Sequence, residues 1–191
     1  IQDLNAIAEI CKEKDVLFHT DACQSFTKTY LNVRKQGLDL VTLNSHKIHG
    51  PKGVGALYVK DGIDISSLMH GGGHEKGLRS GTENVSGIVG FAEASKVVSD
   101  KDIKRMTGLR DKLIVGIMKI GNISVNGSME DRLCNNVNVS FNNIEGEAIG
   151  GYLMQKGICV STGSACMAHS LEPSHVLLAL GKTHLEANSS L

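Results

Sequence analysis

Two residues of this sequence, Lys47 and Cys166, are placed for covalent chemistry because each lies in a segment of small and polar residues. Lys47 is followed by Ile-His-Gly-Pro-Lys-Gly, and Cys166 ends the run Ser-Thr-Gly-Ser-Ala-Cys. Small residues let a substrate approach the backbone closely, and such loops often carry function. A lysine amine forms a Schiff base with a carbonyl group, and a thiolate is a strong nucleophile. The pair therefore predicts a carbonyl cofactor that works with a separate thiol.

Each of the two residues also has a plain structural interpretation. A loop lysine is usually a solvated charge, and Lys52 competes for the role, although its Pro-Lys-Gly setting favours an exposed turn. A free cysteine is commonly a small buried residue. The loop around Cys166 has few large side chains to bury it, which favours an accessible thiol. His169, three residues further on, either helps to stabilise a thiolate or is a bystander.

Asp21 and Gln24, in the segment His-Thr-Asp-Ala-Cys-Gln, form a second candidate group. An aspartate at a strand end often does no more than cap the next turn. Beside a Schiff-base lysine it gains another role, because a carboxylate against a pyridine nitrogen keeps the ring protonated and electron-withdrawing. Gln24 could then donate to a ring oxygen. Both interpretations of Asp21 remain open at this point.

The triple glycine at 71–73 suggests a phosphate loop or a metal site, and its spacing fits neither. Lys76 stands where a GxGxxG fingerprint needs glycine, and no GK[ST] ending occurs in the chain. His70 and His74 are four residues apart, like a zinc-binding pair, but three glycines between them disfavour the helix that such a pair requires. We therefore expect no metal site there.

These residues must be positioned by a mixed α/β fold. Short apolar runs indicate buried strands, and apolar residues at helical spacing indicate amphipathic helices. Because Asp21 and Lys47 follow successive strands, we expect both at the carboxyl edge of one sheet, where open α/β sheets bind ligands. The expected strands are 16–20, 38–43, 54–59, 136–141 and a short one at 157–160. The expected helices are 3–14, 84–99, 102–120, 145–156 and 173–180, with 162–171 as a loop.

Composition limits the remaining function classes. The 191 residues include 20 basic and 20 acidic side chains, so the chain has no net positive charge that would attract nucleic acid or a membrane surface. No apolar run reaches the length of a membrane span. The five cysteines show no CxxC pair, which favours reduced thiols and a cytoplasmic location. The organisation changes near residue 100, which predicts a larger domain over 1–100 and a smaller one over 101–191.

The chain resembles the cysteine desulfurases of the NifS/IscS type, in the class V aminotransferase superfamily of fold-type I pyridoxal-phosphate enzymes. The resemblance covers nearly all of the chain and rests on six motifs in the family's order and approximate spacing. These motifs are Asp-Ala-Cys-Gln, Ser-His-Lys-Ile-His-Gly-Pro-Lys-Gly, His-Gly-Gly-Gly-His-Glu, Arg-Ser-Gly-Thr, Asn-Asn-Val-Asn-Val and Ser-Thr-Gly-Ser-Ala-Cys. It implies that residues 1–100 are part of the large cofactor domain and that 101–191 form the small domain with the cysteine loop.

The resemblance also implies a role for each candidate residue. Lys47 would bind pyridoxal 5'-phosphate covalently, Asp21 would pair with its pyridine nitrogen, and Gln24 would contact its ring hydroxyl. His46 would help hold the phosphate, and Thr82 would reach the phosphate of a partner subunit, which implies a homodimer.

Cys166 would take sulfur from L-cysteine, leaving L-alanine and an enzyme persulfide. The sulfur would pass to an iron–sulfur scaffold or another acceptor protein, for iron–sulfur cluster assembly or tRNA thiolation. No resident metal is implied, although Cys166 could transiently ligate an iron–sulfur cluster with a scaffold partner.

The sequence departs from the family pattern in three places. Asn44 stands where the family usually has a phosphate-binding serine, and both its amide and the neighbouring Ser45 hydroxyl could replace that contact. The family's ring-stacking histidine and phosphate-binding turn would precede Ile1, and its carboxylate-binding arginine would follow Leu191. The chain thus reads as a fragment, and we expect this piece alone not to turn over cysteine.

Two alternatives stay open at the level of sequence. One is a related enzyme with the same cofactor, such as a selenocysteine lyase or a transaminase-like protein, of which a transaminase would not need Cys166. The other is a non-catalytic fold-type I relative that serves as a binding or regulatory subunit.

Overall fold

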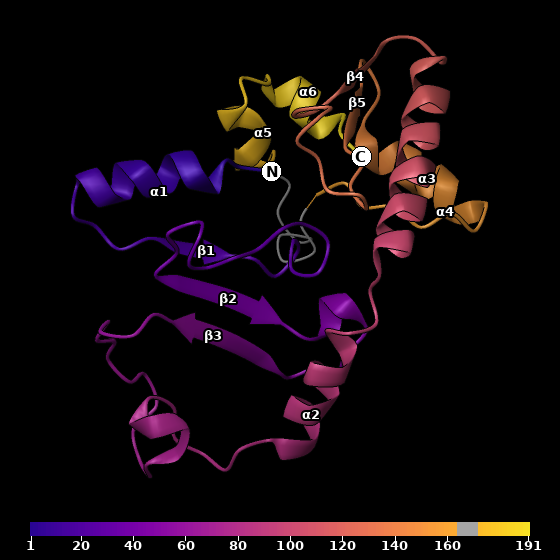
Figure 1. The fold of residues 1–191 in the computed structure, drawn as a ribbon. Coiled ribbons are helices and arrows are strands. Elements are labelled where there is room, and N and C mark those ends of the chain that lie inside the picture. The colour runs from indigo at the N-terminus through magenta and orange to yellow at the C-terminus, as the bar shows by residue number, and fades with distance from the viewer. Residues whose placement is uncertain (164–171) are drawn as a thin grey trace. The chain divides into compact units, whose positions relative to one another are not determined.

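The N-terminal unit of the chain, residues 2–103, is built on a three-stranded sheet with the order β1–β2–β3. The computed structural model describes residues 1–163 and 172–191 (Figure 1). β1 (His19–Asp21) and β2 (Leu40–Asn44) are parallel, with Asp21 opposite Thr42. β3 (Gly55–Val59) is antiparallel to β2, with Gly55 opposite Asn44. The carboxyl ends of β1 and β2 therefore lie at the same edge of the sheet.

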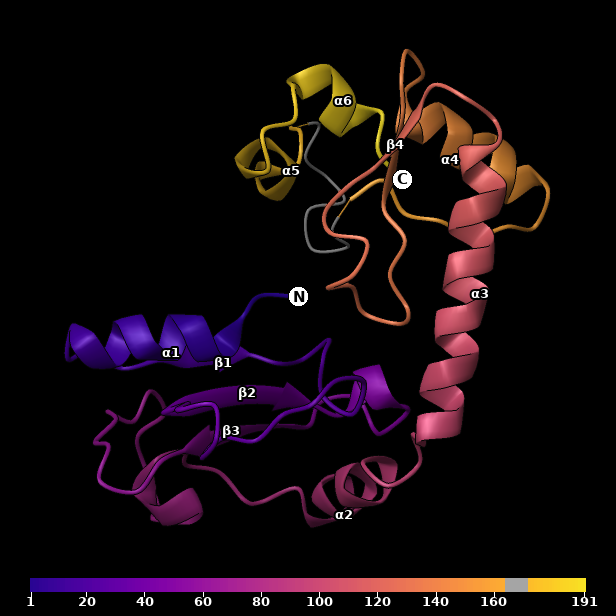
Figure 2. The same ribbon diagram turned by 45° about the horizontal axis from the view of Figure 1, so that its top comes forward.

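Helix α1 (Leu4–Glu13) covers part of this sheet with its apolar side. Asp3 caps the helix, because its Oδ1 accepts hydrogen bonds from the backbone N–H groups of Asn5 and Ala6 at 3.0 and 3.2 Å. Apolar residues recur at helical spacing, and Figure 2 shows the helix lying along one side of the sheet. The residues that pack against the buried cluster of Phe18, Ala22, Leu38 and Val41 include Leu4, Ile7, Ala8 and Cys11.

Helix α2 (Val85–Ala94) packs against the turn that joins β2 to β3. A Cβ atom added at Gly87 would lie 2.4 Å from Val54 Cγ2, and one added at Gly90 would lie 2.7 Å from Pro51 Cγ. Glycine at these two positions therefore permits the close approach. The ring of Phe91 meets Phe26 edge-on with centroids 6.2 Å apart, which joins α2 to the segment after β1.

The remaining elements of the N-terminal unit are short helical turns. The 3₁₀ turn η1 (His46–Ile48) directly follows β2, and η2 (His74–Gly77) lies in the glycine-rich connection. Glu75 and Lys76 in η2 have positive φ values of 48° and 58°, so a left-handed turn follows the triple glycine. Gly71, between His70 and His74, has a φ of 150°, which is incompatible with the right-handed helix that a His70/His74 metal pair would need.

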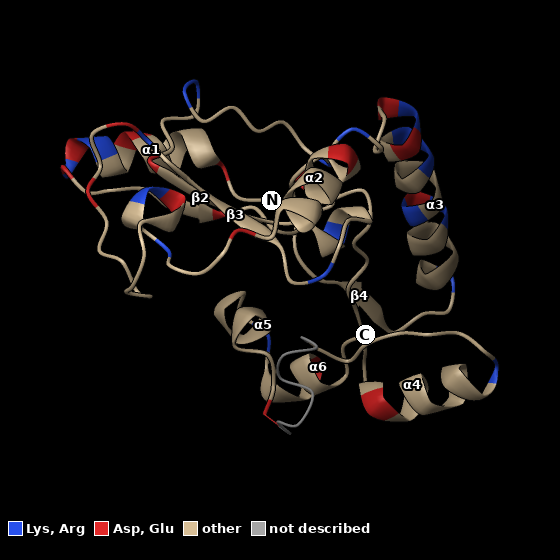
Figure 3. Cartoon of the chain, turned by 90° about the horizontal axis from the view of Figure 1, so that it is seen from below, with Lys and Arg blue, Asp and Glu red and all other residues tan. Residues whose placement is uncertain are grey.

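The C-terminal unit comprises residues 104–191 together with Ile1. Helix α3 (Asp100–Met118) enters this unit, and acidic and basic side chains mix in its first half (Figure 3). β4 (Ile123–Val125) and β5 (Val139–Phe141) form an antiparallel pair. The chain end runs beside β5, where the N–H and C=O groups of Val139 and Leu191 exchange hydrogen bonds of 3.0 and 2.8 Å. The other helices are α4 (Gly146–Gln155), α5 (His175–Ala179) and α6 (His184–Asn188).

Most expected elements are confirmed to within a few residues, and four features were predicted wrongly or missed. The first strand was predicted at 16–20, but it begins at His19, because Val16 and Leu17 are exposed and precede the sheet. The short strand expected at 157–160 is wrong, since these residues are exposed and extend no described sheet. Strand β4 and helix α6 were not predicted. The loop predicted at 162–171 lies mostly outside the described residues.

Candidate active site

The ends of β1 and β2 bring Asp21 and the Lys47 turn to one edge of the N-terminal sheet. Asp21 is the last residue of β1, while Asn44 is the last residue of β2 and Lys47 is the middle residue of η1. The parallel register of the two strands places these groups as neighbours. The prediction that Asp21 and Lys47 follow strands of one sheet is thus confirmed.

Asp21 is held in its ionised form by hydrogen bonds from one residue. Its Oδ1 accepts the backbone N–H of Cys23 at 2.8 Å. The pKa of Asp21 is lowered, chiefly by a hydrogen bond with the Cys23 side chain and then by this backbone bond. The carboxylate is exposed at the sheet edge, so an ionised acceptor faces the open side of the strand ends.

The turn that carries Lys47 is fixed through its backbone, and its side chain remains exposed. The Lys47 N–H donates to Asn44 Oδ1 at 3.2 Å, and the Lys47 carbonyl accepts from Lys28 Nζ at 3.3 Å. Lys28 Nζ also donates to the carbonyl of Gln24 at 3.1 Å. The segment after β1 and the turn after β2 are therefore joined through Lys28.

Ser45 is the predicted site residue that is least able to reach a ligand. Its side chain is fully buried, and Oγ has no hydrogen-bond partner among the described residues. A Cβ atom at Gly50 would lie 2.0 Å from this oxygen and 3.0 Å from the Ala94 Cβ atom. The hydroxyl thus points into the packing beneath the turn. Its predicted contact with a cofactor would require the turn to rearrange.

The other predicted site residues are exposed. His46 is the first residue of η1, and Gln24 lies in the turn after β1. Thr82 lies between η2 and α2, three residues before the first residue of that helix. Contacts through Cys23 and Asn44 join Asp21 to Lys47 at the strand ends, and Thr82 lies outside this group. Cys166 and His169 lie outside the described residues.

Sequence reasoning missed Cys23, whose thiol lies among the groups at the strand ends. Its Sγ is 3.9 Å from the Thr42 carbonyl oxygen. Burial first, and then the hydrogen bond with Asp21 and its charge, raise the pKa of Cys23 to about 11. A signal was present, because an aspartate commonly accepts the N–H of the residue two positions on.

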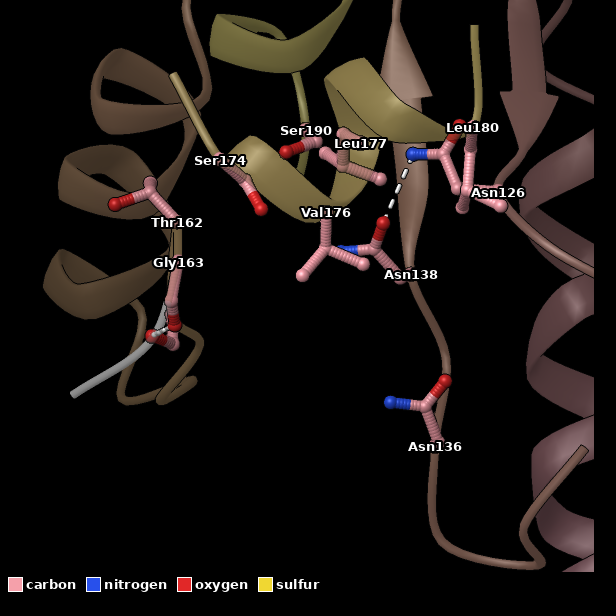
Figure 4. Close-up of a pocket in the computed structure, with 11 residues that line it drawn as sticks. Asn126, Asn136, Asn138, Thr162, Gly163, Ser174, Val176, Leu177, Leu180 and Ser190 are labelled. Atoms are coloured by element: carbon pink, nitrogen blue, oxygen red, sulfur yellow. Dashed lines mark hydrogen bonds between the residues drawn. The ribbon is translucent and has the colours of Figure 1, made fainter. Parts of the chain in front are cut away.

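A cavity of about 290 Å³ lies in the C-terminal unit and is lined by amide, hydroxyl and aliphatic groups (Figure 4). Asn126 is 4% exposed and donates through Nδ2 to Asn138 Oδ1 at 2.8 Å and to Ser140 Oγ at 2.8 Å. Leu177 and Leu180 supply apolar lining. The lining residues within 1–163 and 172–191 carry amide, hydroxyl and aliphatic groups and no ionisable side chain.

Residues 1–163 and 172–191, the described ranges, hold neither a cluster of metal ligands nor a membrane-spanning helix. Within them, no group of three or more His, Cys, Asp or Glu residues is arranged to hold a metal ion. None of the helices there is both long enough and apolar enough to cross a membrane.

A family model described as Aminotransferase class-V matches residues 1–185. The chain belongs to the class-V aminotransferase family. Cysteine desulfurase IscS of Histophilus somni is 48% identical over 196 aligned residues, which cover all of this chain and 48% of the relative. Cysteine desulfurase IscS of Methylobacillus flagellatus is 46% identical with the same coverage. The chain thus spans about half the length of the curated relatives it matches.

Solved structures of similar proteins have the same fold. A NifS-like protein from Rickettsia africae superposes with a TM-score of 0.88 at 33% identity, covering 100% of this chain and 51% of that one. SspA in complex with cysteine gives a TM-score of 0.80 at 34% identity, covering 100% and 53%. The predicted α/β fold of the fold-type I class is therefore confirmed, as is the resemblance to NifS/IscS-type proteins.

Proposed function

We propose that the full-length protein is a cysteine desulfurase that uses pyridoxal 5'-phosphate to remove sulfur from L-cysteine. The observation that carries this proposal is the ionised Asp21 carboxylate beside the turn of Lys47, at the carboxyl ends of adjacent strands. An anionic acceptor and an exposed amine on one sheet edge suit the two ends of a pyridine aldehyde. The similarity to proteins named cysteine desulfurase supports the same reaction.

The donor set at the strand ends fits pyridoxal phosphate. Lys47 would bind its carbonyl carbon, Asp21 would hold the proton on its ring nitrogen, and Gln24 would donate to its ring hydroxyl. When bound, the cofactor supplies an electron sink that weakens the carbon–sulfur bond of the substrate. The phosphate would be held by donors that follow β2 or precede α2, for which we propose Asn44, Ser45, His46 and Thr82. The buried hydroxyl of Ser45 makes it the weakest member of that set.

The sulfur atom leaves through Cys166. Its thiolate attacks the substrate sulfur, so that a sulfur–sulfur bond forms and the carbon–sulfur bond breaks. The electron pair stays on the substrate carbon, which takes up a proton to give L-alanine, and the enzyme is left with a persulfide. One cysteine and one thiol thus yield one alanine and one persulfide. The persulfide would then pass to an iron–sulfur scaffold or another acceptor protein, such as one serving tRNA thiolation.

We propose a homodimer because Thr82 lies outside the group of residues at the strand ends. An exposed threonine before α2 suits the phosphate of a cofactor in a partner subunit. We further propose that residues 1–100 belong to the large cofactor domain and 101–191 to the small domain. The described cysteines Cys11, Cys23, Cys134 and Cys159 are free thiols, which supports a reducing, cytoplasmic location.

The proposal is tested by alanine formation from L-cysteine, with the full-length protein, added pyridoxal phosphate and a thiol reductant. Lys47→Ala and Cys166→Ser should each abolish turnover. The matched controls are Lys52→Ala, an exposed lysine on the following turn, and Cys159→Ser, an exposed cysteine seven residues before Cys166. Both controls should keep wild-type turnover. Unchanged turnover in Cys166→Ser, amino transfer in place of alanine formation, or turnover of L-selenocysteine with none of L-cysteine would contradict the proposal.

A further inference from the structure

Cys23 lies between the two strand ends that carry the proposed chemistry. It is the second residue after β1 and is half-buried. Its thiol donates to the Thr42 carbonyl oxygen at an Sγ to oxygen distance of 3.9 Å. Thr42 is the strand partner of Asp21 in the parallel pair. The side chain of Cys23 therefore reaches from the end of β1 to β2.

The same residue holds the Asp21 carboxylate from two directions. Its backbone N–H donates to Asp21 Oδ1 at 2.8 Å, and its single S–H is shared between this carboxylate and the Thr42 carbonyl oxygen. Hydrogen bonds to a charged acceptor are stronger than those between neutral groups, and two of them restrict how a carboxylate turns. Cys23 thus fixes both the charge and the orientation of Asp21.

On the other side of the sulfur lie the groups that follow β2. The Asn44 side chain hydrogen-bonds Cys23, and the positive charge of Lys47 acts on the thiol. Asn44 Oδ1 in turn accepts the Lys47 N–H at 3.2 Å. One chain of contacts therefore runs from Asp21 through Cys23 and Asn44 to Lys47.

We propose that Cys23 is a positioning residue that sets the Asp21 carboxylate in place relative to Lys47. This inference rests on the proposed function, in which these two residues hold opposite ends of one planar ring. Asp21 must then lie at a fixed distance and angle from the Lys47 turn, and Cys23 bridges the two strand ends that carry them.

The proposal needs a thiol that keeps its proton, and the surroundings of Cys23 provide this. Burial and the adjacent Asp21 carboxylate disfavour a thiolate, and they raise the pKa of Cys23 to about 11. At neutral pH the side chain is a hydrogen-bond donor and a poor nucleophile. The Cys23 thiol, on which the charge of Lys47 acts, is therefore expected not to receive the transferred sulfur.

The first test uses the full-length apoprotein, so it does not depend on cofactor binding. Iodoacetamide alkylation at pH 8 is followed at each cysteine by peptide mass spectrometry, in wild type and Asp21→Asn. Removing the negative charge beside the sulfur should speed alkylation of Cys23 about ten-fold, since rate follows the thiolate fraction. Cys11, half-buried in α1, is the internal control and should not change. Equal rates at Cys23 in both proteins would overturn the proposal.

The second test compares Cys23→Ala, Cys23→Ser and the control Cys11→Ala in the full-length protein. Pyridoxal phosphate labelled with ¹⁵N at the ring reports its affinity by titration and its ring protonation by nitrogen chemical shift. Cys23→Ala should weaken affinity about ten-fold and shift the ring nitrogen toward its unprotonated value, because a donor to a charged group is lost. Cys23→Ser keeps a donor and should resemble wild type, as should Cys11→Ala.

The outcomes separate this inference from the proposed function. Wild-type affinity and ring shift in Cys23→Ala, or equal impairment in Cys23→Ser, would overturn the positioning role while desulfurase activity stands. If the variants show the predicted alkylation rates and ring-nitrogen chemical shifts but the wild-type protein forms no alanine, the desulfurase reaction is overturned and the positioning role of Cys23 stands. If Cys23→Ala fails to fold, the alkylation rates in Asp21→Asn decide the matter.

Discussion

Adding one methyl group at Gly50 should destabilise the turn that presents Lys47. A Cβ atom there would lie 2.0 Å from Ser45 Oγ, 3.0 Å from the Ala94 Cβ atom and 3.1 Å from the Ser45 carbonyl oxygen. Ser45 is fully buried, and the Gly50 N–H already donates to its carbonyl at 3.1 Å, so the turn has little room to relax. Overpacking of this kind costs about 1–3 kcal/mol, and we expect Gly50→Ala near the upper end.

The shortest contact of the added Cβ atom is with Ser45 Oγ, so the free-energy cost of this one contact can be measured separately. Ser45→Ala removes the oxygen at 2.0 Å and leaves the two contacts at 3.0 and 3.1 Å. Because this oxygen has no partner in the described ranges, Ser45→Ala alone should be neutral or stabilising. Gly50→Ala should then cost only about 1 kcal/mol in the Ser45→Ala background. The double-mutant cycle thus predicts a coupling energy of about 1–2 kcal/mol.

Urea denaturation of the full-length apoprotein, followed by circular dichroism, measures this cycle. The control is Gly108→Ala, because a Cβ atom at Gly108 in α3 meets nothing within 4 Å. That substitution should stabilise the protein by about 0.5–1 kcal/mol, since glycine costs entropy inside a helix. The reasoning is refuted if Gly50→Ala is as harmless as Gly108→Ala, or if Ser45→Ala gives no relief.

Three further predictions concern stability and use the same denaturation assay. Thr183→Ala removes the capping box at α6, where Thr183 and Glu186 exchange hydrogen bonds of 2.9 and 3.2 Å, and should cost about 1 kcal/mol; an unchanged midpoint would contradict this. Gly146→Ala should cost about 3 kcal/mol or more, because its Cβ atom would lie 2.4 Å from the Ser190 carbonyl oxygen, and a loss below about 1 kcal/mol would count against it. Hydrogen bonds from the Phe18 N–H and from Lys60 Nζ lower the pKa of Asp39. A lowered carboxyl pKa gives stability that is present at neutral pH and lost as pH falls through the folded-state pKa. Asp39→Asn should therefore be less stable than wild type at pH 7, with the difference shrinking below pH 3.8, and a difference independent of pH would argue against this cause.

The elements that the sequence predicted well are those specified by local patterns. Helix α1 was recognisable because Leu4, Ile7, Ala8 and Cys11 share one helical face, and these residues do pack on the core. The meeting of Asp21 and Lys47 was predictable because parallel strands end at a common edge. Strand β4 was missed because three residues are too few to show the alternation of polar and apolar side chains that indicates a strand.

The features that sequence reasoning could not supply depend on contacts between distant segments. Ser45 looked like a phosphate donor beside Lys47, but its orientation is set by packing against Gly50 and Ala94, and no motif records that contact. The role of Cys23 depends on the Thr42 carbonyl of a neighbouring strand. The strand expected at 157–160 fails because its residues are exposed and gain no partner strand among those described.

The central claim, that Lys47 and Cys166 act in sequence on one sulfur atom, is tested most directly by following that atom. The full-length protein with pyridoxal phosphate is given L-cysteine labelled with ³⁴S, without reductant, and its peptides are analysed by mass spectrometry. The account predicts one labelled sulfur added to Cys166 for each alanine formed, and none in Lys47→Ala. Alanine formation with the label on Cys23, or with no label on Cys166, would contradict it.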